Sequence, residues 1–331
     1  MDTEPERVPT VLRVPITVPE RPSSMLFDFA TSFNSLGDAL VLRPQPQRWN
    51  VDSEFGILRE VMLGAPDYLE MVPCNGVARS GLEQGLTCSP ALAIDQHEKL
   101  VGTLERAGVR CHQVPSVPGL PDLCFTRDSS FMTPWGLVLL RLASEHRRGE
   151  AAQVRAAAES WGVPIIAEIE RGTVEGGDVC LLRPGLVAIG WSGDRTSREG
   201  AEALAAIFEQ RGWRALLTRF DPQFLHLDTL FTLVDRHRAI ACVEALEDGF
   251  LATIADLDIA IVPASSREVD TLGPNLLALG DGRVLSATDN VRINGELERL
   301  GYRVLTVDIG QFTRCGGGVH CLTMPLSRLP S

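Results

Sequence analysis

A repeated unit of strand, strand, helix and strand is the feature of this sequence that most constrains its fold. Two short apolar stretches joined by a tight turn begin at residues 131, 179, 229 and 275, so the repeats are separated by 48, 50 and 46 residues. In each repeat a helical stretch and a final apolar strand follow this hairpin. Such a period is typical of proteins whose neighbouring repeats bury each other's sheets, because one repeat is too small to bury its own.

The boundaries of the repeats follow from the alternation of apolar stretches and turn residues. The hairpins are expected at 131–143, 179–191, 229–246 and 275–288. The helices are expected at 149–162, 197–213, 247–258 and 290–302, several of them ended by a glycine. The final strands are expected at 163–169, 214–220, 259–265 and 303–309.

An earlier, incomplete copy of the repeat brings the number of units to five. It has a strand at 56–66, a helix at 91–108 and a strand at 109–114. The sequence therefore predicts an α/β fold in which five β-β-α-β units form a closed ring. The alternative is an ordinary α/β protein in which the period is accidental.

The composition excludes some classes of ligand. Of the 331 residues, 44% are hydrophobic and 22% are charged, which is ordinary for a soluble globular protein. The formal net charge of −12 argues against a nucleic-acid partner, since such proteins carry basic surfaces, and it is compatible with a cationic ligand. No apolar run reaches the roughly 18 residues of a membrane-spanning helix, so no membrane partner is expected.

Two regions of different character are expected along the chain. Residues 1–50 form a proline-rich arm without the apolar core of a secretory signal, and residues 51–331 form a single catalytic domain. The eight cysteines are scattered without paired spacing. This indicates reduced thiols in a cytoplasmic protein rather than a disulfide framework.

Polar residues gather immediately before the hairpins. FTRD (125–128), EGGD (175–178) and HLD (226–228) precede the first three hairpins. The glycine-rich segment CGGGVHC (315–321) follows the last strand and leads back toward the first unit. Because equivalent positions of successive units meet at one end of a ring's axis, these four clusters are expected to line one pocket.

Each cluster also has a purely structural interpretation. Asp128 could cap a turn or a helix, and Gly176 and Gly177 could form an ordinary turn. His226, in the apolar stretch FLHLDTLFTLV, could be a satisfied core histidine. Asp228 weighs against that interpretation, because residues i and i+2 of a strand share a face and an apolar strand does not bury two such groups without partners.

The expected pocket holds one thiol, one imidazole and several carboxylates. A guanidinium ion is planar, has five N–H donors and pairs naturally with two carboxylates. Held in this way, its central carbon is open to attack by a thiolate. Its positive charge would also lower the pKa of the thiol on binding.

The motifs FTRD, EGGD, HLDTLFTLVD and GGGVHCLT, together with the opening FGILREVMLGAP, resemble the guanidine-modifying enzymes, most closely arginine deiminase and dimethylargininase-type hydrolases. The resemblance covers roughly residues 51–327. It implies a five-bladed α/β propeller, or pentein fold, of five ββαβ modules around a pseudo-fivefold axis. It also implies hydrolysis of a guanidine C–N bond with release of ammonia or an amine, and neither a cofactor nor a metal ion.

The resemblance implies a role for each candidate residue. Cys321 would attack the guanidinium carbon and form a thiouronium-type adduct. His226, oriented by Glu175, would protonate the departing nitrogen and then activate water. Asp128 and Asp228 would hold the guanidinium nitrogens. The remaining candidates for substrate contacts are Phe125, Asp178, Arg195 and Arg314.

The expected partner is a small cationic guanidino compound. Phe125 would lie against its plane, and Arg195 and Arg314 would bind a carboxylate. The segment 67–90 is too short for the helical insertion of bacterial arginine deiminases, and agmatine deiminases share a similar ending, so arginine, modified arginines and agmatine all remain open. A homo-oligomer is compatible with the sequence.

Three other functions remain open. An amidinotransferase would use the same residues to pass the amidino group to an amine. A zinc site could use His226, Asp228, His320 and Cys321, although their spacing lacks the close pairs of common zinc motifs. A third alternative is a non-catalytic binding module on the same scaffold. Cys315 is expected to be a neighbour of the site rather than its nucleophile.

Overall fold

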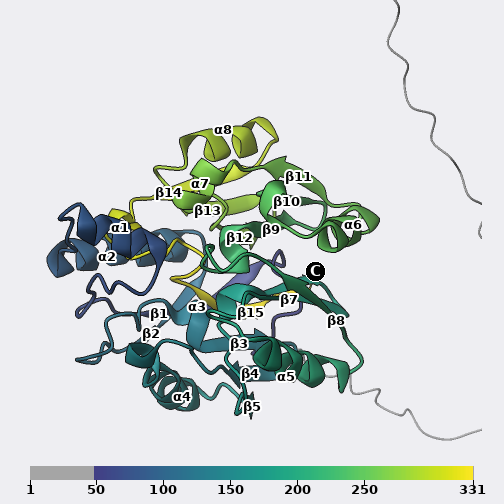
Figure 1. Cartoon of the computed structure of the whole chain (residues 1–331), viewed down its shortest axis with the longest axis horizontal. Helices are drawn as coiled ribbons and strands as arrows, with labels where there is room; N and C mark the ends of the chain where they lie inside the picture. Colours follow the sequence, from purple (N-terminus) through teal and green to yellow (C-terminus); the bar gives the residue numbers. More distant parts are fainter. Residues whose placement is uncertain (1–47, 331) are drawn as a thin grey trace, which may run out of the picture. The chain divides into compact units, whose positions relative to one another are not determined.

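A computed structural model describes residues 48–330, in which five small three-stranded sheets are arranged as a ring (Figure 1). Each sheet contains one antiparallel pair and one parallel pair of strands. The prediction of an α/β fold with five ββαβ modules is therefore confirmed. Residues 1–47 of the predicted arm lie outside the described residues.

Four modules are continuous in the sequence, and their elements lie at the predicted places. The second module contains β3 (Ser130–Thr133), β4 (Gly136–Leu139), α4 (Glu150–Trp161) and β5 (Ile165–Glu168). The third contains β6 (Val179–Arg183), β7 (Leu186–Trp191), α5 (Arg198–Glu209) and β8 (Arg214–Arg219). The fourth contains β9 (Phe231–Asp235), β10 (Arg238–Ala241), α6 (Asp248–Asp256) and β11 (Ala260–Pro263). The fifth contains β12 (Leu277–Gly280), β13 (Arg283–Ala287), α8 (Val291–Arg299) and β14 (Arg303–Val307).

The first module is completed by a strand from the far end of the sequence. β1 (Leu58–Gly64) runs parallel to β2 (Arg110–Val114), after α2 (Pro90–Arg106), and antiparallel to β15 (Met324–Arg328). β15 is not predicted from the sequence because it contains Pro325, which a strand tolerates only at a sheet edge such as this one. Nη1 of Arg328 donates to the carbonyls of Gly56 at 2.6 Å and Ala278 at 2.8 Å. Because Ala278 lies in β12, the second hydrogen bond connects β15 to the fifth module.

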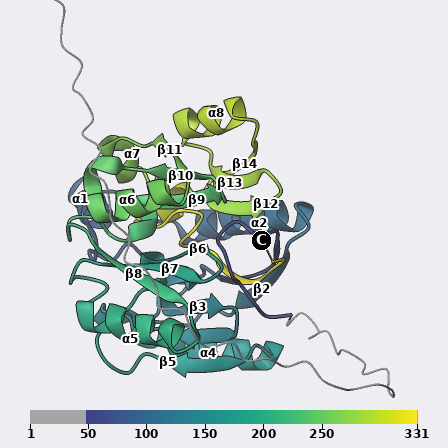
Figure 2. The same ribbon diagram turned by 90° about the vertical axis from the view of Figure 1, so that its right-hand side faces the viewer.

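The main helices lie around the outside of the ring (Figures 1 and 2). In α5, the Ser197 hydroxyl accepts the backbone N–H of Gly200 at 3.1 Å and so caps the first turn. Ala201, Leu204 and Phe208 recur at helical spacing and form the buried face against β7 and β8. Burial of a leucine- or phenylalanine-sized side chain contributes about 1.5–3 kcal/mol to stability.

Short helical turns lie immediately before three of the hairpins. They are α3 (Thr126–Ser129), η2 (Gly176–Asp178) and η3 (Leu227–Thr229). The expectation that His226 and Asp228 share one face of a strand is wrong, because η3 forms here and β9 begins only after it. The backbone N–H of Leu227 donates to Oδ1 of Asp178 at 2.8 Å. The Thr229 hydroxyl donates to the carbonyl of His226 at 2.7 Å, which closes the turn.

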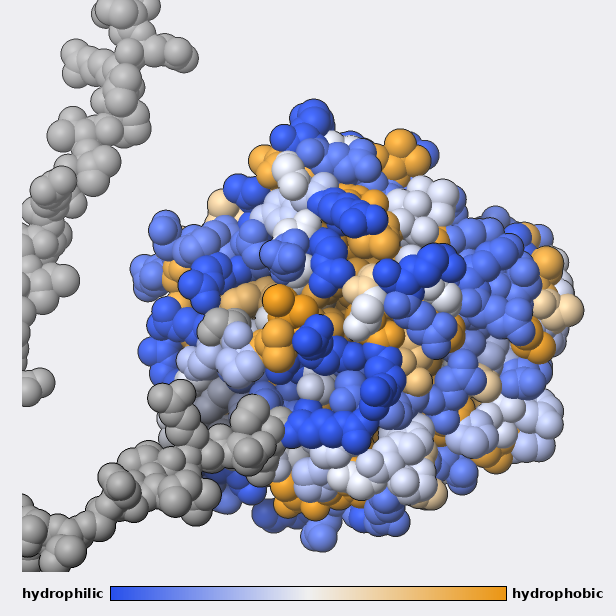
Figure 3. All heavy atoms as spheres, turned by 180° about the vertical axis from the view of Figure 1, so that it is seen from behind, coloured by the Kyte–Doolittle hydropathy of each residue, from blue (hydrophilic) through white to orange (hydrophobic). Residues whose placement is uncertain are grey.

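The remaining short elements are α1 (Gly76–Glu83), η1 (Glu145–Arg147), η4 (Val243–Ala245), α7 (Ser266–Asp270) and α9 (Gly310–Arg314). The face seen in Figure 3 is mostly hydrophilic, with small separate hydrophobic areas. Among residues 48–330, every helix is too short or too polar to cross a membrane.

Candidate active site

Each module places a polar side chain shortly before the edge strand of its antiparallel pair. These residues are Asp128 before β3, Asp178 before β6, Asp228 before β9, Asn275 before β12 and Cys321 before β15. All five side chains are buried. The repeat therefore brings five segments that are far apart in the sequence to one end of the ring.

His226 and Glu175 form a buried hydrogen-bonded pair. Nε2 of His226 lies 2.8 Å from Oε2 of Glu175, which also lies 3.5 Å from Nη1 of Arg195. Burial alone would lower the pKa of His226, but the charges of Asp128 and Asp178 and the hydrogen bond to Glu175 raise it to about 10. The imidazole is therefore protonated at neutral pH and is ready to donate a proton.

Glu175 remains ionised although it is fully buried. Burial alone would raise its pKa, but the hydrogen bond from His226 and the positive charges of Arg195 and Arg147 hold the pKa below its ordinary value. The backbone N–H of Ala143 also donates to Oε1 of Glu175 at 3.1 Å. Glu175 thus fixes the orientation and the charge of the imidazole.

Arg147 holds Asp128 in place. Nη1 of Arg147 donates to Oδ2 of Asp128 at 2.8 Å, while Nε and Nη2 bind the two carboxylate oxygens of Glu150 at 2.8 and 2.9 Å. The backbone N–H of Gly177 donates to Oδ1 of Asp128 at 3.3 Å. A Cβ atom on Gly177 would lie 2.7 Å from Nδ1 of His226, so this glycine is needed for the close approach of the imidazole.

The sulfur of Cys321 lies between an amide and a carboxylate. Nδ2 of Asn275 donates to Sγ at 3.2 Å, and Oδ2 of Asp228 lies 3.7 Å from Sγ. Oδ1 of Asn275 accepts the backbone N–H groups of His320 at 3.0 Å and of Cys321 at 3.3 Å. Burial and the charges of Asp228 and Asp128 raise the pKa of the Cys321 thiol. By themselves, these residues keep the thiol neutral at neutral pH.

Asp228 is anchored on one side and free on the other. Its Oδ2 lies 2.8 Å from Nδ1 of His320. Burial would raise the pKa of Asp228, but this hydrogen bond and the charge of His320 lower it, so the carboxylate is ionised. Oδ1 of Asp228 and Nδ1 of His226 are buried and have no hydrogen-bond partner within residues 48–330. Buried polar atoms of this kind are costly, and here they mark positions that a ligand can satisfy.

The three consecutive glycines before His320 and Cys321 let three side chains approach the backbone. A Cβ atom would lie 2.6 Å from Asn75 at Gly316, 2.1 Å from Phe125 at Gly317 and 2.4 Å from Asn275 at Gly318. Gly316 also has φ +95°, a backbone conformation that favours glycine. The glycine run is therefore required by close contacts around the site.

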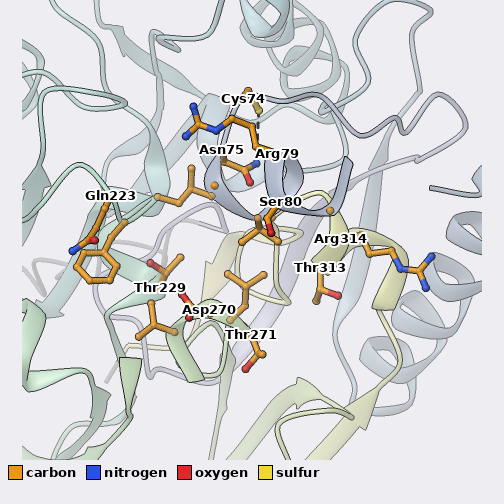
Figure 4. A pocket seen from close by; sticks show the side chains of 18 of the residues that line it. Cys74, Asn75, Arg79, Ser80, Gln223, Thr229, Asp270, Thr271, Thr313 and Arg314 are labelled. Atoms are coloured by element: carbon orange, nitrogen blue, oxygen red, sulfur yellow. Dashed lines mark hydrogen bonds between the residues drawn. The ribbon is translucent and has the colours of Figure 1, made fainter. Parts of the chain in front are cut away.

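A narrow chamber of about 20 Å³ leads outward from Cys321 and is lined by Phe125, Asp128, Arg147 and His226 among others. It adjoins a larger cavity of about 720 Å³, which we call the outer pocket (Figure 4). The residues that line both spaces are Cys74, Asn75, Leu225 and Gly316. The chamber and the outer pocket therefore adjoin along these four residues.

The predicted substrate-binding residues do not all reach the chamber. Phe125, Asp128 and Arg195 line it. Asp228 lines a separate small cavity of about 10 Å³, together with Gly177 and His320, and Asp178 lies behind the chamber and supports η3. Burial raises the pKa of Asp178 to about 7. Arg314 is exposed at the end of α9 and lines the outer pocket rather than the chamber (Figure 4), and its Nη1 donates to the carbonyl of Thr87 at 3.2 Å.

The four residues of the alternative zinc site do not form one cluster. His226 pairs with Glu175, whereas His320 pairs with Asp228. Among residues 48–330, neither group of metal-ligand side chains close enough to share an ion contains Cys321.

Two residues of the site are not expected from the sequence. Asn275 stands shortly before β12, at the position that supplies a site residue in the other modules, so the register of the repeat could have identified it. Arg147 lies in the polar stretch SEHRRGE, where nothing distinguishes it from Arg148. Only burial separates the two, since Arg147 is 4% exposed and Arg148 lies at the surface.

A five-bladed α/β ring with a cysteine, a histidine–glutamate pair and two buried aspartates near its axis defines a guanidine-modifying enzyme of the pentein class. Comparisons with known proteins lead to the same class. The model of the arginine deiminase family matches residues 105–258 and 251–328.

Individual relatives agree with the family match. Dimethylarginine dimethylaminohydrolase of Pseudomonas aeruginosa is 29% identical over 254 residues, which cover 75% of this chain and 95% of that protein. Arginine deiminase of Mycobacterium avium is 33% identical over 247 residues, which cover 64% of this chain and 61% of that protein.

Solved structures share the fold. A mutant of the Pseudomonas aeruginosa dimethylarginine dimethylaminohydrolase in complex with citrulline gives a TM-score of 0.67 at 24% identity, covering 81% of this chain and 99% of that one. The N-terminal domain of ArgZ, a cyanobacterial arginine dihydrolase, gives a TM-score of 0.72 at 19% identity, covering 81% and 97%. The chain belongs to the arginine deiminase family, and it is a hydrolytic enzyme that acts on C–N bonds of guanidino groups.

Proposed function

We propose that the chain hydrolyses a small, arginine-like guanidino compound through a covalent adduct on Cys321. The observation that carries this proposal is the position of Asp228 beside the thiol. Its carboxylate lies 3.7 Å from Sγ, and its Oδ1 has no donor in the described part of the chain. A carboxylate at this distance opposes ionisation of the thiol, so the arrangement favours a ligand that brings its own positive charge.

A guanidinium ion satisfies this requirement. Its N–H groups would donate to Asp228 and Asp128, and its plane would lie against Phe125. The positive charge compensates the two carboxylates and lowers the pKa of Cys321, so that the thiol loses its proton to solvent. The thiolate of Cys321 therefore forms when a positively charged substrate is bound.

The first half of the reaction transfers the amidine carbon to sulfur. The thiolate of Cys321 attacks the guanidinium carbon and forms a C–S bond. Protonated His226 donates its proton to the departing nitrogen, the C–N bond breaks, and ammonia or an amine leaves. The pKa of about 10 for His226 matches this role, since a proton donor must be protonated at the working pH.

The second half returns the enzyme to its starting state. His226, now neutral, accepts a proton from a water molecule, whose oxygen attacks the carbon of the thiouronium adduct. The C–S bond breaks, the proton of the new hydroxyl group passes to the sulfur of Cys321, and the neutral thiol and a ureido compound result. Glu175 keeps His226 in one orientation through both proton transfers.

We further propose that the substrate carries a carboxylate at its far end. Arg147 is engaged by Asp128 and Glu150, so Arg195 is the guanidinium group of the chamber wall that favours an anionic group near it. Nη1 and Nη2 of Arg195 are held at 2.9 Å from the Ser144 hydroxyl and 2.7 Å from the carbonyl of Cys74, which fixes this cation in position. Arginine and N-substituted arginines fit better than agmatine, which has no carboxylate.

We also place the reaction in the cytoplasm. All eight cysteines are unpaired thiols, and a reducing compartment keeps a nucleophilic thiol and its neighbours in this state.

A product screen tests the proposed function. The protein is incubated with arginine, methylated arginines and agmatine, and the ureido product and the released ammonia or amine are measured together. We expect equal amounts of both products from an arginine compound, a slower reaction with agmatine, and no reaction in Cys321→Ser. Release of ornithine only when an amine acceptor is added would instead establish an amidinotransferase.

A further inference from the structure

We propose that Cys74, Asp122 and His146 form a binding site for a divalent transition-metal ion, best suited to Zn²⁺, at the mouth of the active-site chamber. One ligand atom from each of the three side chains can be chosen so that all three lie within 4.8 Å of one another. Nε2 of His146 lies 2.7 Å from Oδ2 of Asp122. None of the three takes part in the chemical steps assigned to His226, Glu175 and Cys321.

The donor set is one that zinc accepts. Zn²⁺ binds a thiolate, an imidazole nitrogen and a carboxylate oxygen in tetrahedral sites, where ligand atoms lie roughly 3–4 Å apart. The histidine and aspartate atoms are 2.7 Å apart, and no two of the three ligand atoms are more than 4.8 Å apart. Small side-chain rotations suffice to surround an ion. Mg²⁺ and Ca²⁺, which bind through oxygen, do not match a thiol and an imidazole.

The backbone holds the three ligands in place from different parts of the chain. The carbonyl of Cys74 accepts Nη2 of Arg195 at 2.7 Å, just before α1. The carbonyl of Asp122 accepts the backbone N–H of Phe125 at 2.9 Å, just before α3. His146 lies in η1 between the two strands and the helix of the second module. The cluster is therefore already assembled in the folded protein.

The cluster is open to an ion from solvent. Cys74 lines both the outer pocket and the chamber, and Figure 4 shows it on the wall of the outer pocket. The side chain of His146 is 26% exposed and that of Asp122 is 7% exposed. Three protein ligands leave the fourth tetrahedral position for water, which the outer pocket can supply.

A bound ion would oppose the proposed reaction. It would join the segment before α1 to the segments of Asp122 and His146 at the place where the outer pocket meets the chamber. Its charge would also repel a guanidinium ion that approaches Cys321. Zn²⁺ is therefore expected to inhibit turnover by weakening substrate binding. This consequence rests on the proposed function, whereas metal binding itself does not.

Cobalt binding to a catalytically inactive variant tests the site without any assay of turnover. Co²⁺ replaces Zn²⁺ in such sites and gives an ultraviolet charge-transfer absorption when a thiolate coordinates it. In Cys321→Ser we expect this absorption to appear at one ion per chain. We expect it to vanish in Cys321→Ser/Cys74→Ser and to persist in Cys321→Ser/Cys88→Ser, whose second cysteine lies outside the cluster. Circular dichroism checks that each variant is folded.

Three results would overturn the proposal. Absorption that is already absent in Cys321→Ser would assign the metal to the nucleophile. Absorption that persists without Cys74 would assign it to another thiol. Binding of Co²⁺ without any thiolate absorption would place the ion on other side chains, such as Asp128, Glu175 and His226.

Inhibition of the active protein gives a second, independent measurement. In Cys74→Ser and in His146→Gln, the Zn²⁺ concentration that halves each variant's own rate is expected to rise at least about tenfold, since even indirect partners of metal ligands change affinity by such factors. Unchanged inhibition in both variants would contradict the site. If the chain turned over no guanidino compound, the cobalt experiment would still decide whether the metal binds.

Discussion

The side chain of Asn275 holds Cys321 at two points: its Nδ2 donates to Sγ at 3.2 Å, and its Oδ1 accepts the backbone N–H of the same residue at 3.3 Å. One amide thus fixes both the sulfur and the backbone that carries it. Gly318 makes this possible, because a Cβ atom there would lie 2.4 Å from Oδ1 of Asn275. Asn275 is a positioning residue for the nucleophile in the proposed mechanism.

Replacement of Asn275 by alanine should impair both stability and turnover. The backbone N–H groups of His320 and Cys321 would lose their acceptor, which costs about 1–3 kcal/mol for buried groups. The thiolate would also lose a donor, so the pKa of Cys321 should rise and kcat should fall. Asn294→Ala is the matched control, because Asn294 is also buried and its Nδ2 donates to the carbonyl of Ala287 at 2.9 Å. That variant should lose stability but keep the thiol titration of the wild type.

The two cysteines that flank the glycine run should differ sharply when each is replaced by serine. Cys321→Ser should fold and lose turnover, because a hydroxyl is a much weaker nucleophile than a thiolate. Cys315→Ser should keep most of the turnover, since its sulfur is directed to the carbonyl of Glu70 at 3.8 Å. Steady-state rates and mass spectra of trapped adducts measure both effects. Near-normal turnover in Cys321→Ser would refute the assigned nucleophile.

Replacement of Asp228 by asparagine should make the Cys321 thiol easier to ionise but should weaken substrate binding. The pKa of Cys321 should fall, because its nearest carboxylate charge is removed. KM should rise at least about tenfold, because the loss of one partner of a buried charge pair typically costs 2–5 kcal/mol. The ultraviolet absorbance of the thiolate, with Cys321→Ser as the blank, reports the first effect. Asp289→Asn, an exposed change in the outer pocket, should alter the thiol titration little.

The pair of His226 and Glu175 predicts a dependence of stability on pH. Because folding raises the pKa of His226 from 6.5 to about 10, its protonated form stabilises the fold below pH 6.5, and this contribution is lost as the pH rises toward 10. The pKa of Glu175 is held below 4.5, so its own contribution changes only at more acidic pH. Glu175→Gln should lower the pKa of His226 and move the loss of stability to lower pH.

Urea denaturation at pH values from neutral to alkaline measures this shift. The thiol of Cys321 titrates in both proteins, so only the difference between Glu175→Gln and the wild type is informative. We also expect kcat to fall more than KM rises, since Glu175 acts through His226. Equal pH profiles for the two proteins would show that Glu175 does not set the charge of the imidazole.

Addition of a single methyl group at Gly317 should disturb the chamber. In Gly317→Ala the new Cβ would lie 2.1 Å from Cε1 of Phe125, so the ring or the glycine segment must move. Overpacking of this kind costs about 1–3 kcal/mol. Gly295→Ala in α8, where nothing lies within 4 Å of the new atom, should be neutral or stabilising. The midpoint of thermal unfolding should therefore fall in Gly317→Ala and stay the same or rise in Gly295→Ala. KM should change in Gly317→Ala and stay the same in Gly295→Ala.

The repeat made most of the fold predictable, because each hairpin and helix carries its own local pattern. The closure of the first module was not predictable in this way. Pro325 reads as a break in a strand, and β15 pairs with β1 through register irregularities that no local pattern reveals. The turn η3 was missed for a similar reason, since its apolar residues read as the start of β9. Its acceptor for Leu227 is Asp178 from the preceding module.

The sequence placed the polar clusters at one end of the ring, and the structure brings them together there. The sequence could not show in which direction an individual side chain points. Arg314 and Arg195 looked equivalent as cations, yet only Arg195 lines the chamber. Likewise, the two oxygens of Asp228 are alike in the sequence, whereas in the fold one binds His320 and the other remains available.

The strand β15 has a consequence for how this enzyme comes into being. A ribosome releases β1 before the other four modules and before β15, so the edge of β1 that pairs with β15 stays unpaired until then, and unpaired edges invite association with other chains. Cys321 lies directly before β15. In the proposed mechanism Cys321 is the nucleophile, so its thiol reaches the site only when β15 pairs with β1 and completes the first module.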